Sequence, residues 1–490
     1  MPLSALLLAA TFTRPMERVA TLDPAFAQSV YDSRVVQLLY ETPLAIDYYA
    51  RPYRLTAGYC ELPEVSADGL VYTFRTRGGS AADMAASLER LRDPGLATPN
   101  GWLMKSVDTV VAKDARTVEI RLKSRCHFFP WLMAMSPAAV RRADGSGTGP
   151  FELASWRKNH EMVFSRRPAP GPAPGGPRLF DTVRYLVIDD LSTQWLMFLK
   201  GEIDFLGEVS KDNWDAVMGK DGNLDPTLAA EGVKLHSIPT LDVFYIGVNM
   251  RDGVLGPNKK LRQALNAAFD YPRWEAYFSR RISAADGPVP PGVDGKLDEP
   301  FAYAFDLSLA RRLVAEAGYE GGVDPKTGRR LELTLTFGRA SAGAREMGEL
   351  LASFYEKIGI RLELAFLTWD AFLKAVNEGR VQLYNMGWVG DYPDAENFLQ
   401  LFCSKNVSPG PNHSYYVNPD YDRAYDAALA AATAAERNRH WAACQRMLRE
   451  DCPWVFTHFG KANSLVRPRV GNYVPSDFPY GQEAYFTVNE

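Results

Sequence analysis

The sequence of 490 residues carries no excess of positive charge. Its 55 lysines and arginines stand against 59 aspartates and glutamates, which gives a formal net charge of −4. No run of residues approaches the roughly 18 to 20 apolar positions of a membrane-spanning helix. Proteins that bind nucleic acid or anionic membranes usually present a surplus of basic residues. We therefore expect neither nucleic acid nor a membrane surface as a partner.

Signatures of catalysis are also missing from the sequence. It contains no Gly-x-Ser-x-Gly nucleophile turn and no His-Glu-x-x-His zinc motif. The glycine-rich stretch Gly145–Phe151 lacks the Gly-Lys-Ser/Thr ending of a phosphate loop, which favours a structural turn. The six histidines are dispersed along the chain: His127, His160, His236, His413, His440 and His458. We therefore predict a protein that is not an enzyme and that holds no metal and no cofactor.

Cysteines are few, and none of them forms a Cys-x-x-Cys pair. The five are Cys60, Cys126, Cys403, Cys444 and Cys452. An odd number leaves at least one thiol unpaired. Cys403, Cys444 and Cys452 share the C-terminal third, where one disulfide is possible in an oxidising compartment. Free buried thiols are the favoured interpretation.

Two interpretations stay open for the apolar segment Leu3–Phe12. It is typical of the hydrophobic part of a signal peptide, but no Lys or Arg precedes it and no clean small-residue cleavage site follows. It is equally compatible with a first buried strand. Because the chain is too long for one ordinary core, we expect two or three domains.

Between residues 20 and 180, helix and strand patterns occur without regular alternation. Apolar spacing predicts helices at Ser29–Glu41 and Ala81–Leu91, and aromatic and β-branched residues predict a strand at Leu70–Thr76. Val107–Ala112 and Thr117–Leu122 flank a Lys-Asp turn, which predicts a hairpin. The irregular order favours a separate α+β unit.

From Thr182 onward the pattern changes. The segments Thr182–Ile188, Ser192–Lys200 and Ile203–Leu206 predict a strand–helix–strand unit, with Ser192 as the helix cap. Alternation then becomes regular, with six predicted elements: helix Asp306–Ala317, strand Leu331–Phe337, helix Arg345–Ile358, strand Ile360–Phe366, helix Trp369–Glu378 and strand Val381–Met386. Such alternation favours a mainly parallel sheet with helices on both faces. Ligands bind beyond the carboxyl ends of the strands in sheets of this kind.

The stretch Gly387–Phe402, GWVGDYPDAENFLQLF, lies at that end of the predicted sheet. Its glycines, proline and acids predict a shaped loop after a buried strand. Asp391 lies between Trp388 and Tyr392, so we expect its carboxylate to meet a cation inside an aromatic-walled cavity. Packing in the core is the alternative role of the two aromatic residues. Asp394 is expected to cap a helix near Glu396, and an enzyme using Asp391 and Asp394 as an acid pair is a minor alternative.

Eight sequence motifs, taken in order, resemble the dipeptide and oligopeptide solute-binding proteins of ABC importers, known as bacterial extracellular solute-binding protein family 5. The similarity extends from about residue 20 to the end of the chain. The motifs are TLDPA (Thr21–Ala25), VSADGLVYTFRTR (Val65–Arg77), GTGPF (Gly147–Phe151), GEIDF (Gly201–Phe205), LRQALNAAFD (Leu261–Asp270), LARRLVAEAGY (Leu309–Tyr319), EKIGI (Glu356–Ile360) and GWVGDYPDAENF (Gly387–Phe398).

The resemblance implies an α/β fold of the two-lobed periplasmic-binding-protein type, class II-like, in three segments with an extra α+β domain. Lobe I would combine residues 1–30, 178–250 and 461–490, the additional domain would span 31–177, and lobe II would span 251–460. A monomer outside the cytoplasm would close on a small peptide or peptide-like solute and deliver it to the permease subunits of an ABC importer. Neither catalysis nor a cofactor is implied.

The resemblance also implies site residues. In peptide-binding members the aspartate at the position of Asp391 takes the α-ammonium group of the ligand, and Trp388 and Tyr392 would line the same cavity. The basic residue that some dipeptide binders use for the ligand carboxylate falls near Arg345. An arginine on the protein surface is the alternative role for that residue.

The chain departs from the family pattern in three places. The region after Arg77 is shorter and lacks the usual Phe-His-Asp-Gly turn. The segment Arg167–Pro177, a predicted loop or linker, has prolines and glycines in place of the usual Asn-Pro and Tyr-Trp residues. The amino terminus shows no clear signal and no lipid-attachment cysteine. A cytoplasmic ligand-sensing or chaperone-like protein that keeps the binding fold is therefore the alternative function.

Overall fold

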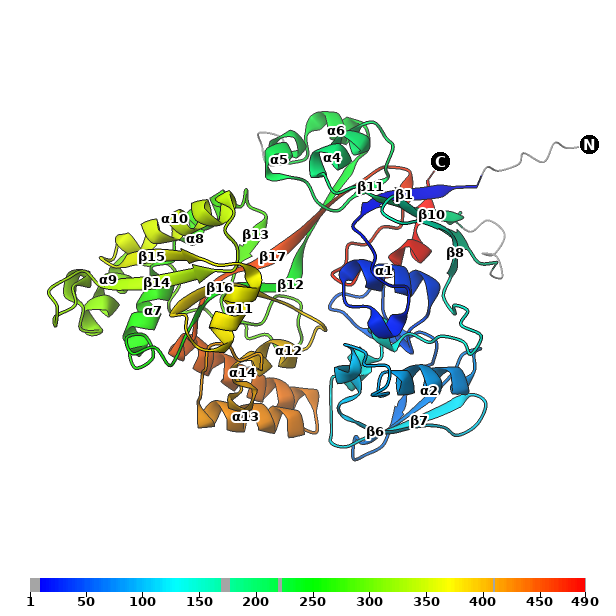
Figure 1. Ribbon diagram of the computed structural model, residues 1–490, viewed down its shortest axis with the longest axis horizontal. Helices are drawn as coiled ribbons and strands as arrows, with labels where there is room; N and C mark the ends of the chain where they lie inside the picture. The colour runs from blue at the N-terminus through cyan, green and yellow to red at the C-terminus, as the bar shows by residue number, and fades with distance from the viewer. Residues whose placement is uncertain (1–8, 169–176, 219–222, 409, 490) are drawn as a thin grey trace, which may run out of the picture. The chain divides into compact units, whose positions relative to one another are not determined.

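The chain divides into two units, which Figure 1 shows as ribbons. The computed structural model describes residues 9–168, 177–218, 223–408 and 410–489. Unit 1 comprises Met1–Ile238 and Ala462–Glu490, and unit 2 comprises Pro239–Lys461. Both boundaries fall inside long strands, β12 (Lys234–Val248) and β17 (Trp454–Val466). The predicted lobe II, 251–460, lies within unit 2, and the division of the rest into lobe I and an additional domain stays a prediction.

A four-stranded sheet supplies side chains to one hydrophobic core of unit 1. Its order is β1–β10–β9–β8, with β1 (Thr11–Met16) parallel to β10 (Thr182–Val187) and the other pairs antiparallel. Strand β9 (Glu161–Arg166) is an inner strand and β8 (Phe151–Arg157) an outer one. The buried aromatic rings of Phe12, Phe164 and Tyr185 come from alternate positions of these strands, as expected for a sheet with one packed face.

A second four-stranded sheet lies in the first 125 residues and confirms the predicted hairpin. Its order is β4–β5–β7–β6, and all pairs are antiparallel. The strands are β4 (Glu64–Val65), β5 (Val71–Arg75), β7 (Thr117–Leu122) and β6 (Val107–Ala112). Helix α2 (Ala81–Arg90) packs on this sheet with Met84 and Leu88 fully buried. The predicted strand, hairpin and helix are therefore confirmed, whereas β4 was not predicted.

The predicted strand–helix–strand unit is only partly correct. Helix α4 (Leu191–Leu199) follows β10, but its cap is Asp190, whose Oδ1 accepts a hydrogen bond from the Thr193 backbone N–H at 2.7 Å. The next strand, β11 (Phe205–Leu206), pairs with Leu465 and Val466 of β17 and not with the sheet of β10. A sequence pattern predicts a strand but not the strand with which it pairs. The prediction that β10 and β11 belong to one unit was therefore wrong.

The sheet of unit 2 is mixed, so the prediction of a mainly parallel sheet is wrong. Its order is β17–β12–β16–β14–β15, and β13 (Ile282–Ala284) pairs with β17. Strand β14 (Glu332–Phe337) is parallel to both β15 (Arg361–Phe366) and β16 (Leu383–Val389). Strand β16 is antiparallel to β12. Because β12 is far from β16 in the sequence, the sequence did not indicate the direction in which the two strands pair. The regular helix–strand alternation covered only the three parallel strands.

Three helices bury their apolar faces in one core of unit 2. These are α7 (Lys259–Ala267), α9 (Leu307–Glu316) and α10 (Ala342–Glu356), which contribute Leu265, Leu313 and Phe354 among others. Helix α11 (Trp369–Asn377) also buries Phe372. The C-terminal helices α13 (Pro419–Ala430) and α14 (Ala434–Asp451) pack against each other.

Ten further α-helices and β-strands complete the described residues. They are α1 (Val30–Leu39), β2 (Leu44–Ile46), β3 (Leu55–Ala57), α3 (Phe129–Leu132), α5 (Lys211–Val217), α6 (Pro226–Ala230), α8 (Tyr271–Tyr277), α12 (Glu396–Leu399), β18 (Val470–Gly471) and β19 (Thr487–Val488).

Several sequence predictions concern cysteines and the chain's apolar or proline-rich segments. All five cysteines are buried and free, which confirms the favoured interpretation. Within the described residues, no helix combines the length and the apolar character needed to cross a membrane. Residues 3–8 of the apolar segment and 169–176 of the proline-rich segment lie outside the described residues. Strand β1 begins at Thr11, close to the end of that apolar segment.

Candidate functional site

Strand β16 extends further than the sequence indicated. Gly387, Trp388 and Val389 continue the strand and pair with Phe244, Val243 and Asp242 of β12. We expected a loop to begin at Gly387, because glycine usually marks a turn. Here glycine gives room instead, since a Cβ atom at residue 387 would lie 2.7 Å from the Phe244 ring. The shaped loop therefore begins at Gly390.

One buried amide positions the residues on both sides of this loop. Asn397 of α12 is fully buried, and its Oδ1 accepts hydrogen bonds from Trp388 Nε1 at 3.0 Å and from the Asp391 backbone N–H at 3.2 Å. Its Nδ2 atom lies 3.4 Å from Asp391 Oδ2. Sequence reasoning missed Asn397, although its position six residues after Asp391, inside the same motif, was a usable signal.

Asp391 lies in the loop after β16, and the residue is exposed to solvent. Surrounding protein nevertheless raises its pKa by desolvation, and the contact with Asn397 only partly offsets this effect. No described Lys, Arg or His of unit 2 forms an ion pair with it. A carboxylate in this state gains free energy when a cation approaches, because the cation restores the charge partner that the fold does not supply.

The two aromatic residues beside Asp391 are placed differently. Trp388 is half-buried, with its indole N–H held by Asn397. Tyr392 is only 4% exposed, and its hydroxyl donates a hydrogen bond to Glu396 Oε2 at 2.5 Å. Tyr425 of α13 donates to Glu396 Oε1 at 2.5 Å. In unit 2, Trp388 therefore retains accessible surface near Asp391, whereas Tyr392 is packed in the core; their ligand contacts stay predictions.

The buried Glu396 is an unusual acid. Burial raises its pKa to about 7, and the two tyrosine hydroxyls lower it less than burial raises it. The nearby Asp394 adds to the rise, and Lys405 opposes it. Sequence reasoning gave Glu396 no role. Its pKa is raised because helices remote in the sequence bury it, and the sequence does not show this burial.

Asp394 binds the beginning of helix α12, as the sequence predicted. Its Oδ1 accepts a hydrogen bond from the Glu396 backbone N–H at 3.0 Å. Its Oδ2 lies 3.6 Å from Arg437 Nη1 of α14. These contacts assign Asp394 a structural role in unit 2.

Arg345 lies in the first turn of α10, where its side chain is exposed. Its guanidinium lies 4.7 Å from the centre of the Phe366 ring, at the end of β15. Strand β14 separates β15 from β16 in the sheet, and no described contact joins Arg345 to Asp391. A role for Arg345 in binding a ligand carboxylate therefore stays a prediction.

Strand β12 carries a partly buried acid that was not predicted. Asp242 of β12 lies opposite Val389 of β16, two residues before Asp391. Asp242 accepts a hydrogen bond from Thr240 Oγ1 at 3.0 Å, and burial raises its pKa. The register of β12 and β16, which the sequence does not give, places Asp242 opposite Val389.

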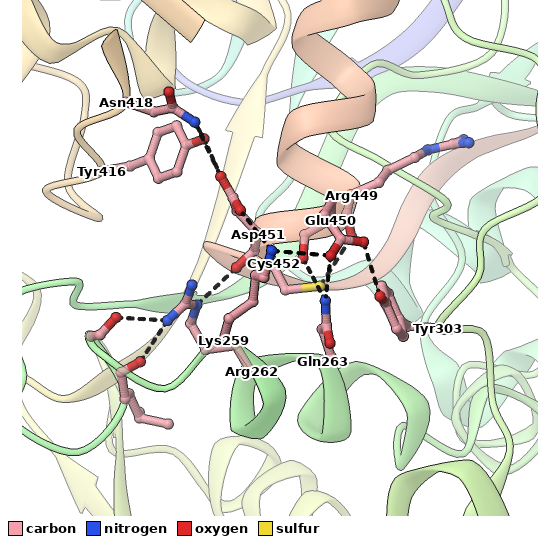
Figure 2. A network of polar contacts seen from close by, with 12 residues as sticks. Lys259, Arg262, Gln263, Tyr303, Tyr416, Asn418, Arg449, Glu450, Asp451 and Cys452 are labelled. Atoms are coloured by element: carbon pink, nitrogen blue, oxygen red, sulfur yellow. Dashed lines mark hydrogen bonds and ion pairs between the residues drawn. The ribbon is translucent and has the colours of Figure 1, made fainter. Parts of the chain in front are cut away.

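Figure 2 shows a network of polar contacts that joins α7 to the end of α14. Arg262 of α7 is 4% exposed and donates to the backbone carbonyl oxygen of Asp451 at 2.8 Å. It also donates to the carbonyl oxygens of Leu255 and Gly256, each at 2.7 Å. The neighbouring Gln263 donates to the Glu450 carbonyl oxygen at 2.8 Å.

Acidic side chains at the end of α14 complete the network. Lys259 Nζ lies 3.1 Å from Glu450 Oε1, and Tyr303 donates to Glu450 Oε2 at 2.9 Å. Tyr416 donates to Asp451 Oδ2 at 2.7 Å. Cationic groups at a helix C-terminus stabilise its unpaired carbonyls. The LRQALNAAFD motif therefore holds helices of unit 2 together.

Comparison with known proteins places the chain in a family. The family model described as bacterial extracellular solute-binding proteins, family 5 Middle, matches residues 24–410. The chain belongs to this family. It is a family of solute-binding proteins and not of enzymes, and it does not favour the cytoplasmic alternative.

Two curated relatives of this family 5 protein cover most of its length. The glutathione-binding protein GsiB of Escherichia coli O1:K1 is 27% identical over 467 residues, which cover 89% of this chain and 86% of that protein. Heme-binding protein A of Haemophilus influenzae is 25% identical over 476 residues, covering 87% and 82%. Both similarities extend well beyond any single motif.

Solved structures share the fold of this family 5 protein. HbpA2 from Haemophilus parasuis matches with a TM-score of 0.85 and 21% identity, over 98% of this chain and 100% of that chain. A dipeptide-binding protein from Pseudoalteromonas sp. SM9913, in complex with Met-Leu, matches with a TM-score of 0.73 and 20% identity, over 98% and 100%. The mixed α/β architecture is thus that of the periplasmic binding proteins.

Proposed function

We propose that this family 5 protein captures a small peptide or peptide-like solute and delivers it to the permease of an ABC importer. Asp391 would bind the α-ammonium group of the solute, and Trp388 would cover the adjoining surface. The protein would act outside the cytoplasm, as a monomer and without catalysis. Closure of two lobes on the solute stays a prediction of the family resemblance.

The observation that carries this proposal is the state of the Asp391 carboxylate. It is accessible, its pKa is raised by desolvation, and no described basic group of unit 2 pairs with it. Asn397 fixes the backbone from which it projects. An ammonium group would supply the missing positive charge, so binding and charge neutralisation would occur together.

Names of the relatives support a peptide-like solute. Glutathione, named for the Escherichia coli relative, is itself a small peptide with an ammonium group. The Pseudoalteromonas structure holds the dipeptide Met-Leu. Because another relative is named for heme, heme belongs in the same screen as a competing solute.

Thermal-shift measurements test the proposal with wild type, Asp391→Ala and Asp298→Asn. Asp298 is an exposed aspartate of the same unit, so its variant controls for the loss of one negative charge. The solutes are dipeptide pools, tripeptide pools and heme. A ligand at about 100 times its Kd stabilises the native state by roughly 2.7 kcal/mol.

The expected result is a rise in Tm with one peptide pool that Asp391→Ala abolishes and Asp298→Asn keeps. A rise with heme alone would contradict a peptide solute. A rise with peptides that survives in Asp391→Ala would contradict the role of Asp391.

The location of the protein requires a separate experiment. Fractionation of cells that produce the tagged native gene product should recover it outside the cytoplasm, and copurification should recover permease subunits. Recovery in the cytoplasm alone would contradict the proposed import role and return the ligand-sensing alternative.

A further inference from the structure

Unit 1 contains a cavity of about 340 Å³ beside the C-terminal end of α1. Its walls come from α1 and the residues that follow it, from β2 and β3, and from residues 476–485 near the end of the chain. All the residues that line it belong to unit 1. The volume falls within the range of about 300 to 1,000 Å³ that is usual for small-molecule sites.

Two hydrogen bonds and one close approach hold the C-terminal wall of this cavity in place. The Tyr48 hydroxyl donates to the Asn472 carbonyl oxygen at 2.6 Å and accepts from the Val474 backbone N–H at 2.8 Å. Gly481 has a φ of +66°, and a Cβ atom there would lie 2.7 Å from the Gln37 carbonyl oxygen of α1. Only glycine meets both conditions, so the sequence builds this wall closely against α1.

Aromatic rings make up much of the lining. The aromatic residues that line the cavity are Tyr40, Tyr48, Phe478, Tyr480 and Tyr485. The rings of Tyr48 and Tyr485 stack with their centres 4.6 Å apart and their planes at 7°. Tyr485 is 42% exposed. Because the faces of aromatic rings attract cations as well as apolar groups, these walls suit an organic cation.

The lining includes two guanidinium groups, and both already have acceptors in unit 1. Arg166 donates to backbone carbonyl oxygens, that of Phe180 at 2.8 Å and that of Ala484 at 3.2 Å. Arg77 forms an ion pair with Glu61, in which Nε lies 3.6 Å from Oε1. Neither arginine therefore needs an anion from outside the protein to complete its contacts.

The acceptors of the lining, in contrast, lack donors. Glu41 forms no side-chain hydrogen bond or ion pair with a described residue. Surrounding protein raises its pKa by desolvation, although the charges of Arg77 and Arg142 lower it. Asp47 forms no ion pair with a residue of the part of unit 1 that the structure describes. Gln482 is 3% exposed, and its buried Oε1 has no donor among the described residues.

We propose that this cavity binds a small organic amine in its protonated form. Glu41 would supply the opposite charge, Gln482 would accept one N–H group, and the Tyr485 ring would cover the carbon skeleton. An ammonium group brings the donors and the positive charge that these acceptors lack. The inference goes beyond the proposed function, because none of these residues belongs to unit 2, which carries Asp391.

Thermal-shift measurements with two matched pools test this site. One pool contains primary alkylamines and arylalkylamines, and the other contains the corresponding alcohols, which have the same carbon skeletons without the charge. The proteins are wild type, Glu41→Gln, Gln482→Met, Glu152→Gln and Asp391→Ala. Glu152 is an exposed glutamate of unit 1 that does not line the cavity, so its variant controls for the loss of one negative charge.

We expect wild type, Glu152→Gln and Asp391→Ala to bind the amines at least about tenfold more tightly than the alcohols, because a charged hydrogen bond is lost in the alcohols. The rise in Tm over a series of concentrations measures this difference. Glu41→Gln should lose the preference for amines, and Gln482→Met should bind them more weakly than wild type. Unchanged amine binding in Gln482→Met would contradict the role of that residue.

The outcomes separate this site from the one at Asp391. Equal responses of wild type to amines and alcohols would overturn the ammonium site, and so would the absence of a response to both pools. An amine response that Glu41→Gln keeps unchanged would also overturn it. If Asp391→Ala abolished that response, the amine would bind in unit 2 and the proposed function would stand. Peptide responses that depend on Asp391 should be the same in Glu41→Gln as in wild type.

Discussion

Asp391 and Asp394 lie three residues apart, yet their side chains meet different surroundings. Asp394 binds the start of α12 and lies near Arg437, whereas Asp391 has no basic partner among the described residues of unit 2. Asn397 holds the backbone of Asp391 and the indole of Trp388. The different roles of Asp394 and Asp391 therefore follow from the residues around them, because both side chains are the same acid.

Asn397→Ala should destabilise the protein and weaken the response to solute. The Trp388 indole N–H and the Asp391 backbone N–H would each lose their acceptor, at a cost of about 2 kcal/mol. Urea unfolding measures the loss, with Asn377→Ala as the control. Asn377 is half-buried, and its side chain accepts a hydrogen bond from Ser408. Equal effects of the two variants would contradict the role of Asn397.

Glu396 should make stability fall as pH rises from about 4.5 to 7. Its folded pKa of about 7 exceeds the ordinary value of 4.5, so the native state binds the proton more tightly than the unfolded state. This stabilisation is fully present below pH 4.5 and is lost as pH rises through 7. The shift corresponds to about 3 kcal/mol.

Denaturant unfolding at pH 5 and pH 7.5 checks this prediction with Glu396→Gln. The variant cannot titrate, so its stability should change less between the two pH values than that of wild type. Glu349→Gln, at an exposed position of α10, is the matched control and should behave as wild type. An unchanged pH dependence in Glu396→Gln would contradict the raised pKa.

Helix α7 buries polar as well as apolar side chains. Arg262, Gln263 and Asn266 lie beneath the surface, together with Leu261 and Leu265. Their donors satisfy backbone carbonyl groups at the end of α14 and in the adjoining segments. A helix of this kind fixes the relative position of elements that are almost 200 residues apart in sequence.

Arg262→Ala should destabilise unit 2 strongly. The change removes the donor from three carbonyl oxygens, those of Leu255, Gly256 and Asp451, at a cost of about 3 kcal/mol. Lys260→Ala is the control, because Lys260 lies on the same helix but is exposed and forms an ion pair with Glu316 at 3.1 Å. Its expected cost is below about 1 kcal/mol. Equal urea midpoints of the two variants would contradict the role of Arg262 in joining α7 to the end of α14.

The whole molecule contains separate cores in its two units. The core of unit 1 includes Phe12, Phe164 and Tyr185, whereas that of unit 2 includes Leu265, Leu335 and Phe354. Two strands, β12 and β17, carry the chain from one unit into the other. Destabilisation of one core is therefore expected to act mainly on its own unit.

Amide hydrogen exchange should reveal this independence. Arg262→Ala should speed exchange in β14 and β16 of unit 2 and leave β1 and β10 of unit 1 close to wild type. Mass spectrometry of peptides from the four strands measures the difference. Equal acceleration in all four strands would show that the units unfold as one.

Local chemistry made much of the chain predictable from its sequence. The hairpin β6–β7, helix α2 and the helix cap at Asp394 follow from alternation, apolar spacing and side-chain hydrogen bonding within a few residues. The order of eight motifs indicated the family, and the family model confirms it. Asp391 stood out because its neighbours in sequence are aromatic.

Tertiary structure alone decided which remote residues meet. The sequence did not indicate the direction of β12, so it could not reveal the mixed sheet, the extension of β16 or the position of Asp242 opposite Val389. Burial by remote helices raises the pKa of Glu396, and the packing of residues 476–485 against α1 places Glu41 and Gln482 around one cavity. Short-range patterns depend on neighbours in the chain, whereas burial and electrostatics depend on neighbours in space.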